Sequence, residues 1–134
     1  MNTLDTLLLL HAGFMVIGFL SMVVGASAAM LMRRKAWWLR LHKRAGFFGT
    51  FCVLSGFVAA VAMIDLSGGE HFRITHHYVG FITAALAVFT PLLGVVQLKV
   101  RDKAARIRPI HRWSGRVTLL MAFMAVGSGL LIIL

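Results

Sequence analysis

Four long runs of uncharged, mostly apolar residues alternate with short polar segments along the chain. The runs cover residues 7–32, 45–64, 78–98 and 117–134, which is 26, 20, 21 and 18 residues. A helix needs about 20 residues to cross the hydrocarbon core of a bilayer, and a spanning segment must satisfy its own backbone, so the runs predict helices rather than strands. We therefore expect an all-α membrane protein with one domain over residues 1–134, built as a four-helix transmembrane bundle with helices at about 4–32, 41–64, 75–98 and 109–134.

Two prolines fall at the last two predicted helices. Pro91 lies inside the third run, where it removes one backbone hydrogen bond and should kink the helix. Pro109 precedes the fourth run, and its position suits the first turn of a helix, where the missing N–H is not needed. We expect the fourth helix to begin at Pro109.

The net charge of +10 comes from basic residues that are concentrated in two segments. Thirteen of the fourteen Lys and Arg lie in residues 33–44 and 99–116, which share one side of the membrane if the helices alternate in direction. This asymmetry places both segments in the cytoplasm, and it places both termini and residues 65–73 on the non-cytoplasmic side. The same distribution argues against nucleic acid as a partner. We expect a multi-pass integral membrane protein of the bacterial inner membrane.

Four of the six histidines begin the same small-residue pattern, which is seen when the helices are aligned on His11, His42, His76 and His111. Fifteen of the sixteen residues at offsets of 4, 7, 14 and 18 are Gly, Ala or Thr, and all offsets fall within about 40° of the histidine direction on a helix. In order of offset they are Met15, Gly46, Gly80, Gly115; Gly18, Gly49, Thr83, Thr118; Gly25, Gly56, Thr90, Ala125; and Ala29, Ala60, Gly94, Gly129. Close helix packing alone would explain the small residues but not a histidine at the head of each row.

A flat cofactor held edge-on between helices explains both features, and haem has that shape. The alternating topology pairs His11 with His76 near the outer side and His42 with His111 near the inner side, so that two histidines ligate each iron. Gly46, Gly80 and Gly115 would leave room for the ring plane beside the ligand, and the small residues at offsets 14 and 18 would make room for the second ring. Zinc is the rival ion, but zinc sites need three or four close ligands. We expect two haem b groups per chain.

The motifs that carry these histidines resemble the cytochrome b561 family of two-haem transmembrane electron carriers. They are His11-Ala-Gly-Phe-Met-Val-Ile-Gly18-Phe-Leu, Arg40-Leu-His42, His76 followed by Gly80 and Gly94, and Arg108-Pro-Ile-His111 followed by Gly115. The resemblance implies electron transfer from a cytoplasmic donor such as ascorbate to an outer acceptor such as monodehydroascorbate or a ferric chelate. It therefore implies a transmembrane oxidoreductase.

The chain departs from the family in two respects. Family members often have six helices, whereas this chain has only the four-helix core, which favours a homodimer or a larger redox complex. The basic residues that match the family's donor site are only approximate, so a quinol or a protein donor is as plausible as ascorbate. A haem-bearing anchor or relay subunit without a small substrate of its own is the alternative function, and a haem-free packing or transport subunit is a further one.

Several weaker site residues complete the prediction. His76 and His77 are about 100° apart on a helix, so only one can face the ring, and Gly80 and Gly94 favour His76. Arg112 is expected to neutralise a haem propionate on the inner side. Candidate substrate contacts are Arg33, Arg34, Lys35, Arg40 and Lys43 on the inner side, and His71, Arg73 and His77 on the outer side.

Overall fold

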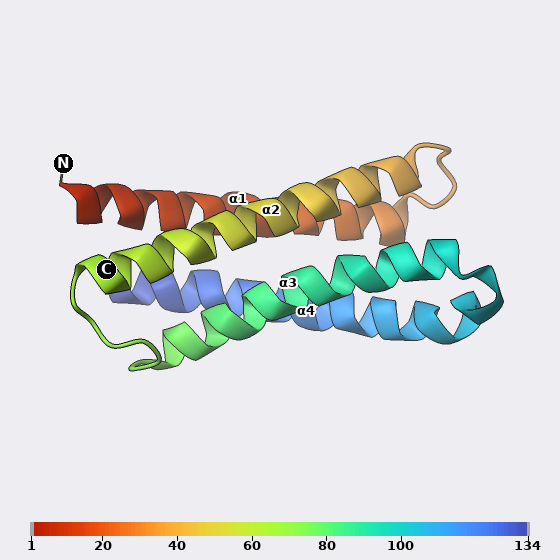
Figure 1. Cartoon of the computed structure of the whole chain (residues 1–134). Coiled ribbons are helices and arrows are strands. Elements are labelled where there is room, and N and C mark those ends of the chain that lie inside the picture. The colour runs from red at the N-terminus through yellow and green to blue at the C-terminus, as the bar shows by residue number, and fades with distance from the viewer. Residues whose placement is uncertain (1, 134) are drawn as a thin grey trace.

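Four long helices make up the computed structural model, which describes residues 2–133 (Figure 1). They are α1 (Thr3–Leu31), α2 (Trp38–Leu66), α3 (Thr75–Lys99) and α4 (Ala104–Ile133), with one 3₁₀ turn, η1 (Arg101–Lys103), before α4. All four are long and apolar enough to cross a membrane, and no strand occurs within residues 2–133. The predicted four-helix membrane architecture is confirmed.

The two ends of the bundle differ in the chain segments that they carry. Both termini and the α2–α3 loop lie at one end, and the other two connections lie at the opposite end (Figure 1). At the first end, α1 starts with a capping box, in which the Asn2 side chain accepts a hydrogen bond from the Asp5 N–H and the Asp5 carboxylate accepts one from the Asn2 N–H. The opposite end carries both basic segments. The charge pattern predicts that the two basic segments lie on one side of the membrane, and the structure places them at the same end of the bundle.

α4 begins earlier than the sequence pattern predicts. The helix starts at Ala104, so Pro109 lies inside it and not in its first turn. Proline at this position leaves the carbonyl of Ala105, four residues earlier, without its helical N–H partner. Ala105 is exposed, so water can hydrogen-bond that carbonyl and the helix can continue through the proline.

Within the bundle, the helices form two tight antiparallel hairpins. α1 packs mainly against α2 and α3 mainly against α4, while the contacts between the hairpins are sparser. Gly18 and Gly49 allow the close approach of α1 to α2, because a Cβ atom on Gly49 would lie 2.9 Å from the Gly18 carbonyl oxygen and 2.7 Å from the Met22 side chain. Small residues at such crossings are common in membrane helices, where association depends on close packing.

The carbonyl that Pro91 leaves unpaired inside α3 has a partner on α2. Pro91 has no N–H for the carbonyl of Ala87, and Ala87 is fully buried. The Thr50 hydroxyl donates a hydrogen bond of 2.8 Å to that oxygen. Pro91 is therefore tolerated because a neighbouring helix supplies the missing donor, and the bond also joins the two hairpins.

Substituting Thr50 with valine is expected to destabilise the protein by about 1–2 kcal/mol, because the buried Ala87 carbonyl would lose its donor. Thermal unfolding in detergent, followed by circular dichroism, measures the change. Thr50→Ser keeps the hydroxyl and serves as the control, so it should remain within a few tenths of a kcal/mol of the wild type. Equal stability of Thr50→Val and the wild type would contradict the role of this bond.

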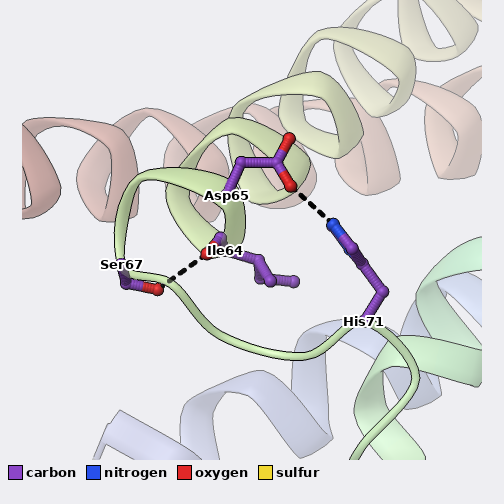
Figure 2. A network of polar contacts seen from close by, with 4 residues as sticks. All are labelled: Ile64, Asp65, Ser67 and His71. Carbon is purple, nitrogen blue, oxygen red and sulfur yellow. Dashed lines mark hydrogen bonds and ion pairs between the residues drawn. The ribbon is translucent and has the colours of Figure 1, made fainter.

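The α2–α3 loop is folded by short-range polar contacts (Figure 2). The Ser67 hydroxyl donates to the Ile64 carbonyl, and the His71 Nε2 lies 2.7 Å from the Asp65 carboxylate. Phe72 has a φ of 60°, an uncommon conformation for a bulky residue, and its ring packs against those of Tyr78 and Phe81. These contacts bring the loop back to the start of α3.

Candidate functional site

The four aligned histidines form two pairs, one toward each end of the bundle. The ring centroids of His11 and His76 are 6.0 Å apart, and those of His42 and His111 are also 6.0 Å apart. Metal–nitrogen bonds of about 2 Å place two opposite ligating nitrogens about 4 Å apart, which this ring separation accommodates. These are the pairs that the alternating topology predicts.

Each pair joins helices that are diagonal to one another in the bundle. His11 and His76 come from α1 and α3, and His42 and His111 come from α2 and α4. Within residues 2–133, no Cα atoms of α1 and α3, or of α2 and α4, lie within 8 Å of each other. The histidines therefore face one another across the interface between the two hairpins.

The Nδ1 atom of each of these histidines is held by the other helix of its own hairpin. The partners are the Gly56 carbonyl for His11 (2.9 Å), the Gly25 carbonyl for His42 (2.9 Å), the Thr90 carbonyl for His111 (3.0 Å) and the Ser128 hydroxyl for His76 (2.9 Å). A carbonyl oxygen only accepts, so at least three of the four Nδ1 atoms carry the proton. The Nε2 atom of these rings then has a free lone pair, which is the form in which neutral imidazole binds a metal.

These hydrogen-bond partners are functional residues that the sequence pattern does not reveal. The sequence pattern identifies Gly25, Gly56 and Thr90 only as small residues 14 positions after a histidine, and it does not single out Ser128. The available signal for Ser128 is a hydroxyl in an otherwise apolar segment, three residues after Ala125.

The structure places His76, and not His77, opposite His11. His77 is adjacent to His76, and together with His11 and His76 it lines a cavity at this end of the bundle, but its Nδ1 atom is buried and has no hydrogen-bond partner among residues 2–133. His76 has both the facing imidazole and the Ser128 hydroxyl.

Open space beside each pair is provided by glycines one turn after three of the histidines. A Cβ atom on Gly46 or Gly80 would meet nothing within 4 Å, and one on Gly115 would lie 3.8 Å from the nearest atom, the Thr90 methyl group. At the outer pair this space is part of a cavity of about 280 Å³ whose walls include His11, His76 and Gly80. Two facing imidazoles beside such space fit a flat ring with a central metal, and haem is a ring of this kind.

Two of the four small residues at offset 18 lie against a histidine ring. A Cβ atom on Gly94 would lie 3.1 Å from the imidazole of His111, and one on Gly129 would lie 3.1 Å from that of His76. Each of these glycines thus seats the histidine of the adjacent helix in the same hairpin, where we expected it to make room for a second ring.

The described residues hold no larger cluster of metal ligands. No group of three or more His, Cys, Asp or Glu is gathered within residues 2–133. Each pair therefore supplies two imidazoles, whereas a zinc ion needs three or four protein ligands. The donor set suits a metal whose other ligands come from a ring.

The outer candidate substrate residues are only partly brought together. His71 and His77 both line the cavity beside the outer pair, but His71 is also bound to Asp65. Arg73 is exposed and does not line this cavity. A larger cavity of about 440 Å³ lies elsewhere, on the apolar surface of α3 and α4 around Trp113, and it contains no histidine.

The inner candidate residues are all exposed at the opposite end. They are Arg33, Arg34, Lys35, Arg40, Lys43 and Arg112. The Arg33 guanidinium is partly engaged, because it donates to the Ala29 carbonyl and lies over the Trp38 ring. The others are exposed at the end of the bundle toward which the His42–His111 pair lies, so this end can attract anions.

Comparison with known proteins yields one match. The model of a family described as eukaryotic cytochrome b561 matches residues 8–133, nearly the whole chain. No curated protein and no solved structure matches the chain. The resemblance seen in the histidine motifs is therefore confirmed, and the chain belongs to the eukaryotic cytochrome b561 family.

Proposed function

We propose that this protein carries electrons from one side of a membrane to the other through two haem b groups, one held by His11 and His76 and the other by His42 and His111. Its family is one of haem-dependent transmembrane electron-transfer proteins, and its four helices make it an integral membrane protein. The proposal adds the number of haems, their ligands and the direction of transfer.

The observation that carries this proposal is the orientation of the four imidazoles. The Nδ1 atoms are turned toward oxygens within each hairpin, and the rings face one another between the hairpins. Helical packing alone requires no such pairing of polar rings, which are costly to place near hydrocarbon.

The two pairs are well placed for a relay across the bilayer. His42 bonds to the carbonyl of Gly25, which follows His11 by 14 residues on α1, or about 21 Å of helix. A haem held by both histidines of a pair would supply one-electron transfer and would leave the iron no free site for a substrate. The oxygens that face each Nδ1 would hold the ligand rings in place.

The partners at the two ends are proposed from charge. Arg34, Lys35, Arg40 and Lys43 are exposed beside the inner pair and suit an anionic donor such as ascorbate, although a quinol or a protein donor would use the same end. Arg112 is proposed to neutralise an inner propionate. On the outer side, His71 and His77 form part of the wall of the cavity proposed for the outer ring, so, with Arg73 nearby in sequence, they would contact a ferric chelate or monodehydroascorbate that docks beside that ring.

The bacterial inner membrane that we expected from the sequence is not supported. The matching family is described as eukaryotic. We therefore propose only that the basic segments at residues 33–44 and 99–116 face the cytoplasm and that the termini face the other side of the membrane.

A visible spectrum of the purified protein tests the proposed function. We expect a reduced α band typical of haem b, with two haems per chain by pyridine haemochrome assay. A colourless protein would exclude electron transfer by haem. If two haems are present, reduction by ascorbate and reoxidation by a ferric chelate would support the oxidoreductase, whereas failure of both reactions would favour the relay subunit.

A further inference from the structure

The four ligand histidines are not anchored in the same way. His11, His42 and His111 each face a backbone carbonyl, but His76 faces the hydroxyl of Ser128. His76 is therefore the only one of the four whose partner is a side chain, and a substitution can remove that partner without altering the backbone.

The hydrogen bonds of Ser128 determine which atom carries the proton. The Ser128 hydroxyl lies 3.2 Å from the Ala125 carbonyl and 2.9 Å from the His76 Nδ1. A hydroxyl has one hydrogen, and a carbonyl can only accept, so the hydrogen points to Ala125 and a lone pair points to His76. His76 must then donate from Nδ1, which leaves Nε2 free, as in the other three histidines.

His76 is thus linked to the backbone through the Ser128 hydroxyl, whereas the other three histidines bond to a backbone carbonyl directly. Gly25, Gly56 and Thr90 each follow a histidine by 14 residues and each offer their carbonyl to the histidine of the adjacent helix. Ala125 is at the equivalent position after His111, but its carbonyl reaches His76 only through the Ser128 hydroxyl. A Cβ atom on Gly129 would lie 3.1 Å from the Cε1 of His76, so the ring also packs closely against α4 beside Ser128.

We propose that Ser128 is a positioning residue that fixes the orientation of His76 and sets the reduction potential of the outer haem separately from that of the inner haem. This inference rests on the proposed function, in which His76 ligates the outer iron. Donation from Nδ1 to a partner makes the imidazole a more basic ligand, and a more basic ligand stabilises ferric over ferrous iron. The Ser128 hydroxyl is the one side-chain partner among the four, so its effect on a ligand can be removed by a single substitution.

The test compares Ser128→Ala with Ser128→Thr in the purified haem-loaded protein. Ser128→Ala should favour the ferrous form of the outer haem about tenfold, a rise of about 59 mV for one electron. The inner potential should stay the same, and one of the two low-spin ferric signals in electron paramagnetic resonance should move. Ser128→Thr retains the hydroxyl, so its outer-haem potential and its paramagnetic resonance signals should equal those of the wild type. A His42→Ala variant should retain only the outer haem, so its single potential identifies which of the two measured potentials belongs to the outer haem.

Ser21→Ala is a matched control, because it removes a hydroxyl that donates to a backbone carbonyl, that of Ala45, without contacting a histidine. It should leave both potentials unchanged. An unchanged or lowered outer potential in Ser128→Ala, an equal shift of both haems, or a Ser128→Thr variant that behaves like Ser128→Ala would overturn the inference. A wild-type protein without haem would instead refute the proposed function itself, so the two failures are distinguishable.

Discussion

Alanine at His42 is expected to reduce the haem content from two per chain to one, the largest effect of any single substitution considered. The variant would lose one of the two proposed iron ligands of the inner site and leaves His111 without the imidazole that faces it. The other pair, about 21 Å away along α1, keeps both histidines and the oxygens that orient them. Pyridine haemochrome assay and redox titration measure the loss, because one of the two potentials should disappear.

Double variants separate the two sites. His42→Ala combined with His111→Ala should lose no more haem than either single variant, because both residues are proposed to ligate the same haem. His42→Ala combined with His76→Ala should lose both haems. His77→Ala is the control and should retain two haems; if it lost the outer haem while His76→Ala retained it, the proposed ligand would be wrong.

Leucine is expected to have a second large effect, on haem binding when it replaces Gly80 and on folding when it replaces Gly49. Leucine at Gly80 would meet no protein atom at its Cβ position, yet it would occupy the space proposed for the outer ring. We expect Gly80→Leu to remain folded and to lose the outer haem. Gly49→Leu, in contrast, would press on the Gly18 carbonyl and on Met22, force α1 from α2, and destabilise the fold by about 1–3 kcal/mol or more.

Helical content and monodispersity in detergent, measured beside haem content, distinguish these outcomes. Gly13→Leu is the matched control, because Gly13 is also open at its Cβ position but lies exposed on the outer surface of α1, so both haems should be retained. Full haem loading of Gly80→Leu would contradict the ring position that we propose. Unchanged folding of Gly49→Leu would contradict the tight α1–α2 contact.

The sequence predicts the helices and the histidine pairs because both depend on strong, repeated signals. Twenty uncharged residues have few alternatives to a spanning helix, and the direction of each helix then decides which histidines share a level. The position of Gly80 could be predicted as open for the same reason, since it is one turn from His76. The choice of His76 over His77 rests in the sequence on Gly80 and Gly94 alone, and the structure agrees in that the His76 ring faces that of His11.

The features that the sequence does not predict arise from single contacts between helices. Nothing in the sequence distinguishes Thr50 from another threonine in an apolar run. It stabilises the fold because its hydroxyl lies beside the Ala87 carbonyl, which has no helical donor since residue 91 is proline. Ser128 likewise acquires its role from the exact register of α3 against α4. The early start of α4 depends on the exposure of Ala105, which the helix-start rule for proline does not consider.

The diagonal placement of the histidine pairs has a consequence for biogenesis. Each hairpin can form as soon as its two helices have been inserted, since the closest packing and all four histidine anchors are internal to a hairpin. The two hairpins contact each other less, so a cofactor ligated from both would join them and stabilise the assembled bundle by mass action. Haem supply would then act as a checkpoint for maturation, with unloaded chains remaining as two loosely associated halves that are open to quality-control proteases.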